Sequence, residues 1–412
     1  MADSTKEAEE DGGAPAEPAL PAKAAVVSCG TLVVLSTVLL SPGIAQMEQE
    51  FSDASEAVVK LVITAPAIAI ALLAPVGGWL CDTLGRKPVL LAGLVGFAAF
   101  GSAGLYVPDI WWLLASRVGL GLSVGAILNS TGTLIGDYAD GGERRKLLGW
   151  QIAALSTLSA GLTLLAAWLV GAYSWRTPMA IYLLSLPLVP WAWASVVEPS
   201  EEMKGDDAEG EGGWSRIPWG RLLPVYGVAF ALLAVFHLAT TQVPTYLKLD
   251  LEYGSPLAVA GVLALMSVIG VPSGLAYPKL RERFEVGNIL TAVLACGAAG
   301  FAVAALWHSL AGLLVGMTVF SVLYGARTPS LNDWTLETAP DAVRGRAVSM
   351  LNSASFAGIF ASPLLSQPLA DRFGIPFVFA FAAILQAAFA VAFAAATVWK
   401  RLPESEPEPF AA

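Results

Sequence analysis

The feature that most constrains this chain is a series of long apolar stretches that recurs along nearly its whole length. A helix that crosses a bilayer needs about 20 mostly apolar residues. Twelve such segments can be read from the sequence: residues 24–46, 57–79, 88–107, 110–136, 147–171, 177–197, 221–247, 256–278, 287–307, 309–336, 346–369 and 375–399. Segments of this length exclude a β-barrel, whose strands are short and alternate between polar and apolar residues. We therefore expect an all-α membrane protein with twelve transmembrane helices.

The composition agrees with lipid as the surrounding solvent. Charged residues make up 14% of the 412 residues and apolar residues 56%, whereas soluble domains are about 25% charged. The net charge of −10 comes largely from an acidic N-terminal tail and an acidic stretch near the middle, which we expect to be solvated and disordered. The three cysteines lie scattered in or beside apolar stretches, so the pattern predicts neither a disulfide framework nor a zinc site.

The Lys and Arg residues predict how the helices are oriented. Cytoplasmic connections of membrane proteins carry an excess of these residues. If the N-terminus is cytoplasmic, most of the 23 Lys and Arg residues fall on that side, and four face the opposite one: Lys60, Arg176, Lys248 and Arg372. The acidic start is unlike a signal peptide. We expect a multi-pass protein of the cell inner (plasma) membrane with both termini in the cytoplasm.

The longest polar interruption divides the chain into two halves of six spans each. It is rich in Gly, Asp and Glu, which is typical of a flexible linker. In both halves an acid closes the fourth span and a base follows it: Asp137 and Arg144, then Glu337 and Arg344. We expect these residues to form ion pairs at the inner ends of two pseudo-symmetric six-helix bundles. The expected division is a tail at 1–23, bundles at 24–197 and 221–400, a linker at 198–220 and a tail at 401–412.

The most specific motif lies between the second and third spans. It reads Gly77-Gly78-Trp79-Leu80-Cys81-Asp82-Thr83-Leu84-Gly85-Arg86-Lys87-Pro88. This resembles the Gly-x-Leu-Ala-Asp-Arg-x-Gly-Arg-Lys loop of the major facilitator superfamily, with matches at Gly78, Asp82, Gly85, Arg86 and Lys87. Glycine allows helices to approach closely and the chain to turn tightly, and a carboxylate can accept a charge-assisted hydrogen bond from arginine. These five residues are the expected gating loop.

The resemblance implies a transporter whose two bundles rock around a central solute site. In such a fold the first, fourth, seventh and tenth spans would line the cavity. Asp82 and Arg86 would close the inner side while the outer mouth is open. The second-half copy of the loop has lost the aspartate, since Pro278 stands in its place, and this leaves the first-half loop as the better gate.

The resemblance to the drug:proton antiporters of the superfamily is partial. The fourth span contains Arg117-Val118-Gly119-Leu120-Gly121, which resembles an Arg-x-x-x-Gly pattern of proton-coupled members. The fifth span, however, has no proline, whereas those antiporters usually carry a Gly-Pro motif there. The first span has no Asp or Glu, which many of them keep.

Two arginines inside spans are candidate solute or coupling residues, because a charge within the bilayer is costly and usually faces a cavity or a partner. Arg117 either takes part in proton movement or extends to the outer interface beside Trp111 and Trp112. Arg327 lies deeper. It either binds a carboxylate or phosphate through two hydrogen bonds or bonds the carbonyls freed around Pro329.

Other polar residues within the spans are weaker candidates. Asp333 either carries a proton or pairs with Lys279 or Arg346 at the inner end. A lone histidine such as His237 either titrates or bonds a backbone carbonyl. The remaining candidates are amides and a phenol, and amides commonly join helices: Asn129, Gln242 and Tyr246.

The predicted function is secondary active transport of a small organic solute by alternating access. Proton-coupled efflux is the first interpretation. The alternative is an organic-anion transporter, because two positive charges stand in the spans without a deep acid on the first-half cavity helices. A non-transporting membrane sensor is a competing class. An enzyme is not expected, since nucleotide, zinc-helix and nucleophile-elbow motifs are absent. We expect no cofactor, no metal and no nucleic-acid partner, and we expect a proton gradient to be the energy source. The protein is expected to be a monomer in the lipid bilayer.

Overall fold

The computed structural model describes residues 20–139, 141–198, 217–253, 255–340 and 343–399. All regular elements in these ranges are helical, which confirms the predicted all-α class. Most of the expected tails and linker lie outside the described residues, so their boundaries stay predictions.

The first half contains nine α-helices joined in places by 3₁₀ turns, within the ranges just given. These elements are α1 (Leu20–Thr31), η1 (Leu32–Val34), α2 (Leu35–Val38), η2 (Ser41–Gly43), α3 (Ile44–Glu50), α4 (Glu56–Leu73), α5 (Gly77–Leu84), α6 (Arg86–Ser102), η3 (Ala103–Leu105), α7 (Ile110–Tyr138), α8 (Gly141–Ala172), η4 (Thr177–Ser185) and α9 (Leu188–Ser195).

The second half begins after the linker and has seven described α-helices. These elements are α10 (Trp219–Leu249), α11 (Pro256–Arg281), α12 (Val286–Leu306), α13 (Leu310–Ser321), η7 (Tyr324–Ala326), α14 (Arg327–Thr338), α15 (Arg344–Phe373) and α16 (Ile375–Trp399).

Ten helical segments in the described part are long and apolar enough to cross a membrane. Two of the twelve predicted spans fall outside this set. The segment 24–46 is divided among α1, η1, α2, η2 and α3, and the segment 147–171 lies in α8, whose apolar stretch is Gly161–Ala172. The twelve-segment layout is therefore consistent with the structure, although the first span is not one continuous helix.

The interruptions have local causes. In the first span, Pro42 removes a backbone N–H donor next to Gly43, and the chain forms the 3₁₀ turn η2 there. In the tenth span, Pro329 has no N–H to donate to the carbonyl of Gly325, so α13 and α14 are separated by η7. Broken membrane helices leave backbone groups free to bind a ligand.

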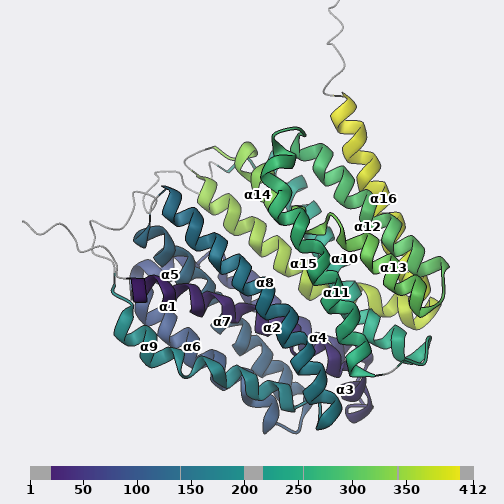
Figure 1. Cartoon of the computed structure of the whole chain (residues 1–412), viewed down its shortest axis with the longest axis horizontal. Helices are drawn as coiled ribbons and strands as arrows, with labels where there is room; N and C mark the ends of the chain where they lie inside the picture. The colour runs from purple at the N-terminus through teal and green to yellow at the C-terminus, as the bar shows by residue number, and fades with distance from the viewer. Residues whose placement is uncertain (1–19, 140, 199–216, 254, 341–342, 400–412) are drawn as a thin grey trace, which may run out of the picture.

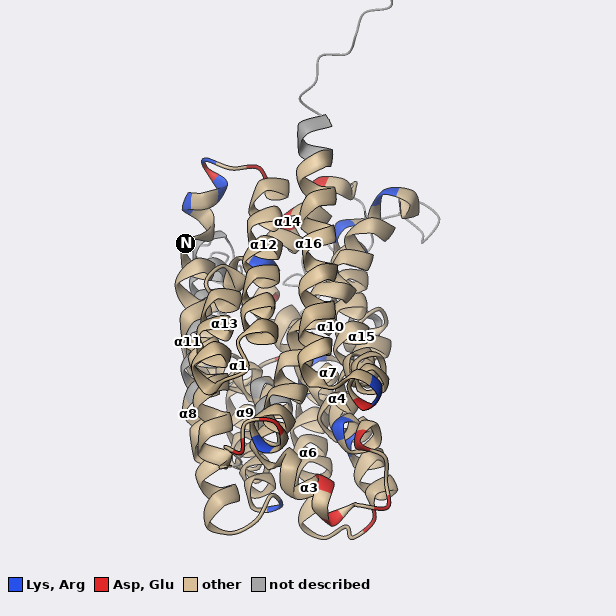
Figure 2. Cartoon of the chain, turned by 90° about the vertical axis from the view of Figure 1, so that its right-hand side faces the viewer, with Lys and Arg blue, Asp and Glu red and all other residues tan. Residues whose placement is uncertain are grey.

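The two halves lie side by side, as Figure 1 shows by the change from purple and teal to green and yellow. They contact each other mainly through α4 against α15 and α8 against α11. Each half has its own buried apolar core. Lys, Arg, Asp and Glu are sparse along the helices, as Figure 2 shows, in keeping with a lipid-facing surface.

Candidate functional site

The break in the tenth span is held directly against α11. A Cβ atom on Gly325 would stand 2.0 Å from the carbonyl oxygen of Gly270 and 2.8 Å from the backbone nitrogen of Gly274. Only a residue without a side chain allows this approach. The break places Arg327 at the first position of α14, near the middle of the 29-residue segment Leu310–Thr338.

Arg327 is half-buried and faces aromatic rings. Its guanidinium carbon lies 4.4 Å from the centre of the Tyr324 ring and 5.9 Å from that of Phe236, within cation–π range. It donates hydrogen bonds to the Tyr324 hydroxyl and to Thr328 Oγ1, whereas bonds to carbonyls around Pro329 were the predicted alternative. Its Nε is buried and has no hydrogen-bond partner, and in the described part of the chain no carboxylate forms an ion pair with it.

The rings beside Arg327 form one continuous apolar wall. Phe236 stacks on Tyr324 at 4.4 Å between centroids, and Phe320 stacks on Tyr324 at 4.9 Å. His237 is buried, its ring centroid lies 5.3 Å from that of Phe236, and its Nδ1 lies 3.3 Å from the carbonyl oxygen of Leu233. This is the backbone contact expected of a lone histidine. A guanidinium beside stacked rings suits a flat organic anion.

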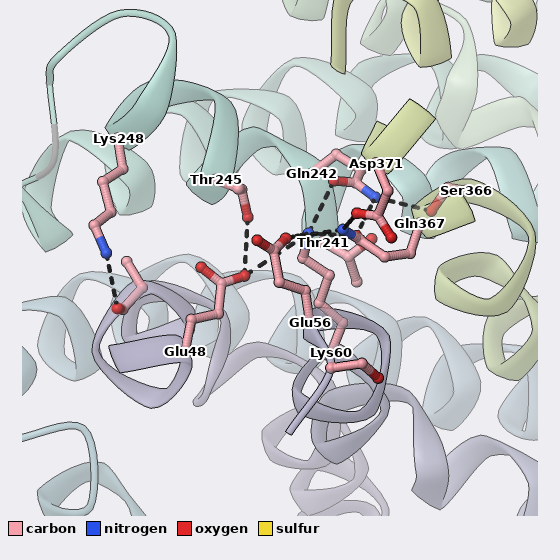
Figure 3. A network of polar contacts seen from close by, with 12 residues as sticks. Glu48, Glu56, Lys60, Thr241, Gln242, Thr245, Lys248, Ser366, Gln367 and Asp371 are labelled. Atoms are coloured by element: carbon pink, nitrogen blue, oxygen red, sulfur yellow. Dashed lines mark hydrogen bonds and ion pairs between the residues drawn. The ribbon is translucent and has the colours of Figure 1, made fainter. Parts of the chain in front are cut away.

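A second polar assembly lies at the predicted outer end, where the halves meet (Figure 3). At its centre Lys60 has no exposed surface. Its Nζ donates to Gln367 at 2.7 Å and to Gln242 at 3.1 Å. We call this assembly the Lys60 network; it comprises Glu48, Glu56, Lys60, Gln242, Thr245, Ser366, Gln367 and Asp371.

The sequence prediction selected Gln242 but missed the rest of this network. Lys60 was assigned to the outer charges, since it lies only four residues into a span. Two signals were visible: Glu56 and Lys60, and Gln367 and Asp371, are each four residues apart and therefore share a helix face. Tyr246, the third residue of the predicted group on α10, is buried against Phe379 instead, with ring centroids 5.3 Å apart.

Arg117 does not have the interfacial position that was one of its two predicted alternatives. It is fully buried, so it does not extend to the interface beside the tryptophans. One of its terminal nitrogens donates to the carbonyls of Phe100 and Gly101 at 2.9 and 2.8 Å, and its guanidinium lies over the Tyr182 ring. These contacts hold the end of α6 against α7. A role in transport stays a prediction.

Asn129 is another first-half candidate with local contacts. Its Nδ2 donates to the carbonyl of Gly125, one turn earlier, at 2.8 Å. Its amide also packs against Gly77, where a Cβ atom would stand 2.0 Å from Nδ2. The amide thus helps to join α5 to α7, as amides within membrane helices commonly do.

The gating loop is fixed within the first half. Gly85 has φ +91°, a conformation that favours glycine, and it makes the turn between α5 and α6. Arg86 Nε donates to Asp137 at 3.0 Å. The carboxylate of Glu198 accepts hydrogen bonds from the backbone N–H groups of Arg86 and Lys87, which caps α6. The surroundings of Gly78 and the side chains of Asp82 and Arg144 lie outside the described part, so the predicted roles of these residues stay predictions.

The second half repeats the inner-end pairing with other residues. Arg281 bonds Glu337, and its Nε lies 3.7 Å from Asp333. The Tyr277 hydroxyl donates to Asp333 at 2.6 Å. Lys279 and Arg346 were the predicted partners of Asp333, and this prediction was wrong. The base that reaches Asp333 is Arg281, on the last turn of α11. Arg344 donates from Nε to the carbonyl of Leu336.

At the opposite end, Glu50 joins the first and sixth spans. It accepts hydrogen bonds from Trp175 and Arg176. Burial alone would raise the pKa of the Glu50 carboxyl, but these bonds and the positive charge of Arg176 outweigh it and hold the pKa below its ordinary value. The carboxylate is therefore ionised and keeps the outer ends of the first half together.

The sequence matches a known family over most of its length. Residues 26–363 match a model described as Major Facilitator Superfamily, and a second match covers residues 286–412. The chain is 23% identical over 357 residues to the gallate transporter of Pseudomonas putida, covering 77% of this chain and 78% of that protein. It is 22% identical over 330 residues to a multi-drug resistance efflux pump PmrA homolog of Lactococcus lactis, covering 75% and 78%.

Solved structures share the fold at lower sequence identity. The crystal structure of a peptide transporter POT superposes with a TM-score of 0.73 and 14% identity, covering 92% of this chain and 93% of that chain. Such a similarity bears on the arrangement of the helices alone.

Proposed function

This chain belongs to the major facilitator superfamily and is a membrane transporter, and we propose that it carries a small, flat organic anion whose carboxylate binds Arg327. The observation that carries this proposal is the buried, unpaired Nε of Arg327 in the interruption of the tenth span. Arg327 reaches the aromatic wall formed by Phe236 and Tyr324, against which the ring of a bound aromatic acid would stack.

The distribution of acids supports an anionic solute. Among the described spans, the acid nearest to the break is Asp333, six residues beyond Arg327, and it is engaged by the Tyr277 hydroxyl and by Arg281. A cationic solute would need a carboxylate near the break, whereas an anion needs the guanidinium that is there. The similarity to a gallate transporter, gallate being an aromatic carboxylate, supports the same solute class.

Proton-linked efflux of a drug-like molecule is the second candidate. It is supported by the similarity to an efflux pump over 75% of the chain. The missing proline in the fifth span speaks against it.

The remaining expectations are part of the proposal. We propose that a proton gradient drives the carrier, that it works as a monomer in the plasma membrane without enzymatic activity, and that both termini are cytoplasmic. The distribution of Lys and Arg supports this orientation.

Transport by purified protein in proteoliposomes tests the solute class. We expect uptake of aromatic carboxylates such as gallate or 4-hydroxybenzoate at least tenfold above empty vesicles, and background uptake of a cationic dye. Imposing and then collapsing a pH gradient tests the driving force. Transport of the cation with no transport of the carboxylates would exclude the anion proposal in favour of efflux.

A further inference from the structure

The Lys60 network joins the two halves of the molecule (Figure 3), with a buried centre at Lys60 and a partly exposed carboxylate at Glu56, whose side chain is 44% exposed. Lys60 and Gln242 have no exposed surface, and Gln367 is 2% exposed. Five hydrogen bonds cross between the halves here: Lys60 to Gln242, Lys60 to Gln367, Gln367 to Glu56, Thr245 to Glu48 and Lys248 to the carbonyl of Ala45.

The chemistry of Lys60 makes these contacts depend on the relative position of the halves. A buried ammonium is costly unless hydrogen-bonding partners surround it. The two close acceptors of Lys60 are amide oxygens of the second half, whereas the first-half carboxylates of Glu56 and Glu48 lie 3.4 and 3.7 Å away. If the halves separate at this end, Lys60 loses both amide oxygens and must be solvated.

The hydrogen bonds of Lys60 connect three helices, one from the first half and two from the second. Lys60 projects from α4, Gln242 from α10 and Gln367 from α15. Gln367 is central because its Oε1 accepts from Lys60 while its Nε2 donates to Glu56 at 2.8 Å and to Asp371 at 2.7 Å. Separation of α4 from α15 therefore breaks several bonds at once, so the network favours two arrangements, joined or apart.

We propose that the Lys60 network is the latch that holds the predicted outer mouth closed, and that its opening is a required step of the transport cycle. The proposal concerns the conformational equilibrium, and it stands whichever solute the central site binds.

Distance measurements between spin labels test the latch. The labels are placed at the exposed positions Asp53 and Leu257, one in each half at this end, in a background in which Cys29, Cys81 and Cys296 are replaced by Ala. In lipid nanodiscs we expect a predominant short distance and a minor long one for the otherwise unchanged protein. In Lys60→Met we expect at least a fivefold larger population at long distance, and Lys60→Arg should return most of it to the short distance.

Two further variants separate the loss of the network from the loss of the Lys60 charge. Gln367→Leu removes two of the five hydrogen bonds between the halves, those with Lys60 and Glu56, and leaves Lys60 in place, so it should also populate the long distance. The matched control is Arg372→Gln, which removes an exposed positive charge five residues away on α15 and should keep the short distance. If folded Lys60→Met and Gln367→Leu proteins both keep the distances of the control, the network is only a structural contact and the latch is overturned.

Discussion

Replacing Arg327 with Ala should lower the rate of carboxylate uptake in proteoliposomes on the order of a hundredfold, since losing one partner of a desolvated charge pair costs about 2–5 kcal/mol. Arg327→Lys should recover little of this rate. Lysine keeps the charge but loses the planar group that donates two parallel hydrogen bonds and stacks on Tyr324.

The control for this comparison is Arg283→Ala, which removes the same side chain from an exposed loop position and should leave uptake unchanged. The thermal midpoint of each purified variant shows whether it is folded. A folded Arg327→Lys protein with the full rate of uptake would rule out recognition by two parallel hydrogen bonds. An undiminished rate in Arg327→Ala would remove the residue from the site altogether.

Gly325→Ala should destabilise the protein and largely abolish transport. The added methyl group would stand 2.0 Å from the carbonyl oxygen of Gly270, so backbone must move against backbone. Overpacking of this kind costs about 1–3 kcal/mol, and occasionally more. The displacement would also move Arg327, two residues further along, away from the aromatic wall. Thermal unfolding and uptake of the purified variant measure the two effects.

A second glycine provides the matched control. Gly261 lies in α11, and a Cβ atom there would meet no other atom within 4 Å. Gly261→Ala should therefore be neutral or stabilise the helix by up to about 1 kcal/mol. Equal thermal midpoints for the two variants would contradict the close approach of η7 to α11.

The architecture was largely predictable, because span length and charge bias act locally along the chain. The interruption in the tenth span could also have been foreseen from Pro329, whose missing N–H affects the carbonyl four residues earlier. The depth of Arg327 and its value as a candidate were likewise evident from the sequence. Its aromatic surroundings were not, since Phe236 lies on another span.

The residues that the sequence prediction misplaced have partners distant in the chain. Lys60 and Gln367 are 307 residues apart, and no local pattern relates them. Arg117 was expected either to take part in proton movement or to extend to the outer interface, and its burial contradicts the second alternative. The carbonyls that it bonds become available only where α6 ends against α7. Asp333 was assigned the wrong basic partner because the reach of Arg281 depends on how α11 packs against α14.

Binding of an acid and its amide to the purified protein tests anion recognition most directly. Isothermal titration should show that 4-hydroxybenzoate binds at least tenfold more tightly than 4-hydroxybenzamide, and that Arg327→Gln abolishes this difference. The two ligands share the ring and the hydroxyl, so the comparison isolates the charge. Equal affinity of the unmodified protein for acid and amide, or an unchanged preference for the acid in Arg327→Gln, would contradict the proposal that Arg327 selects the solute.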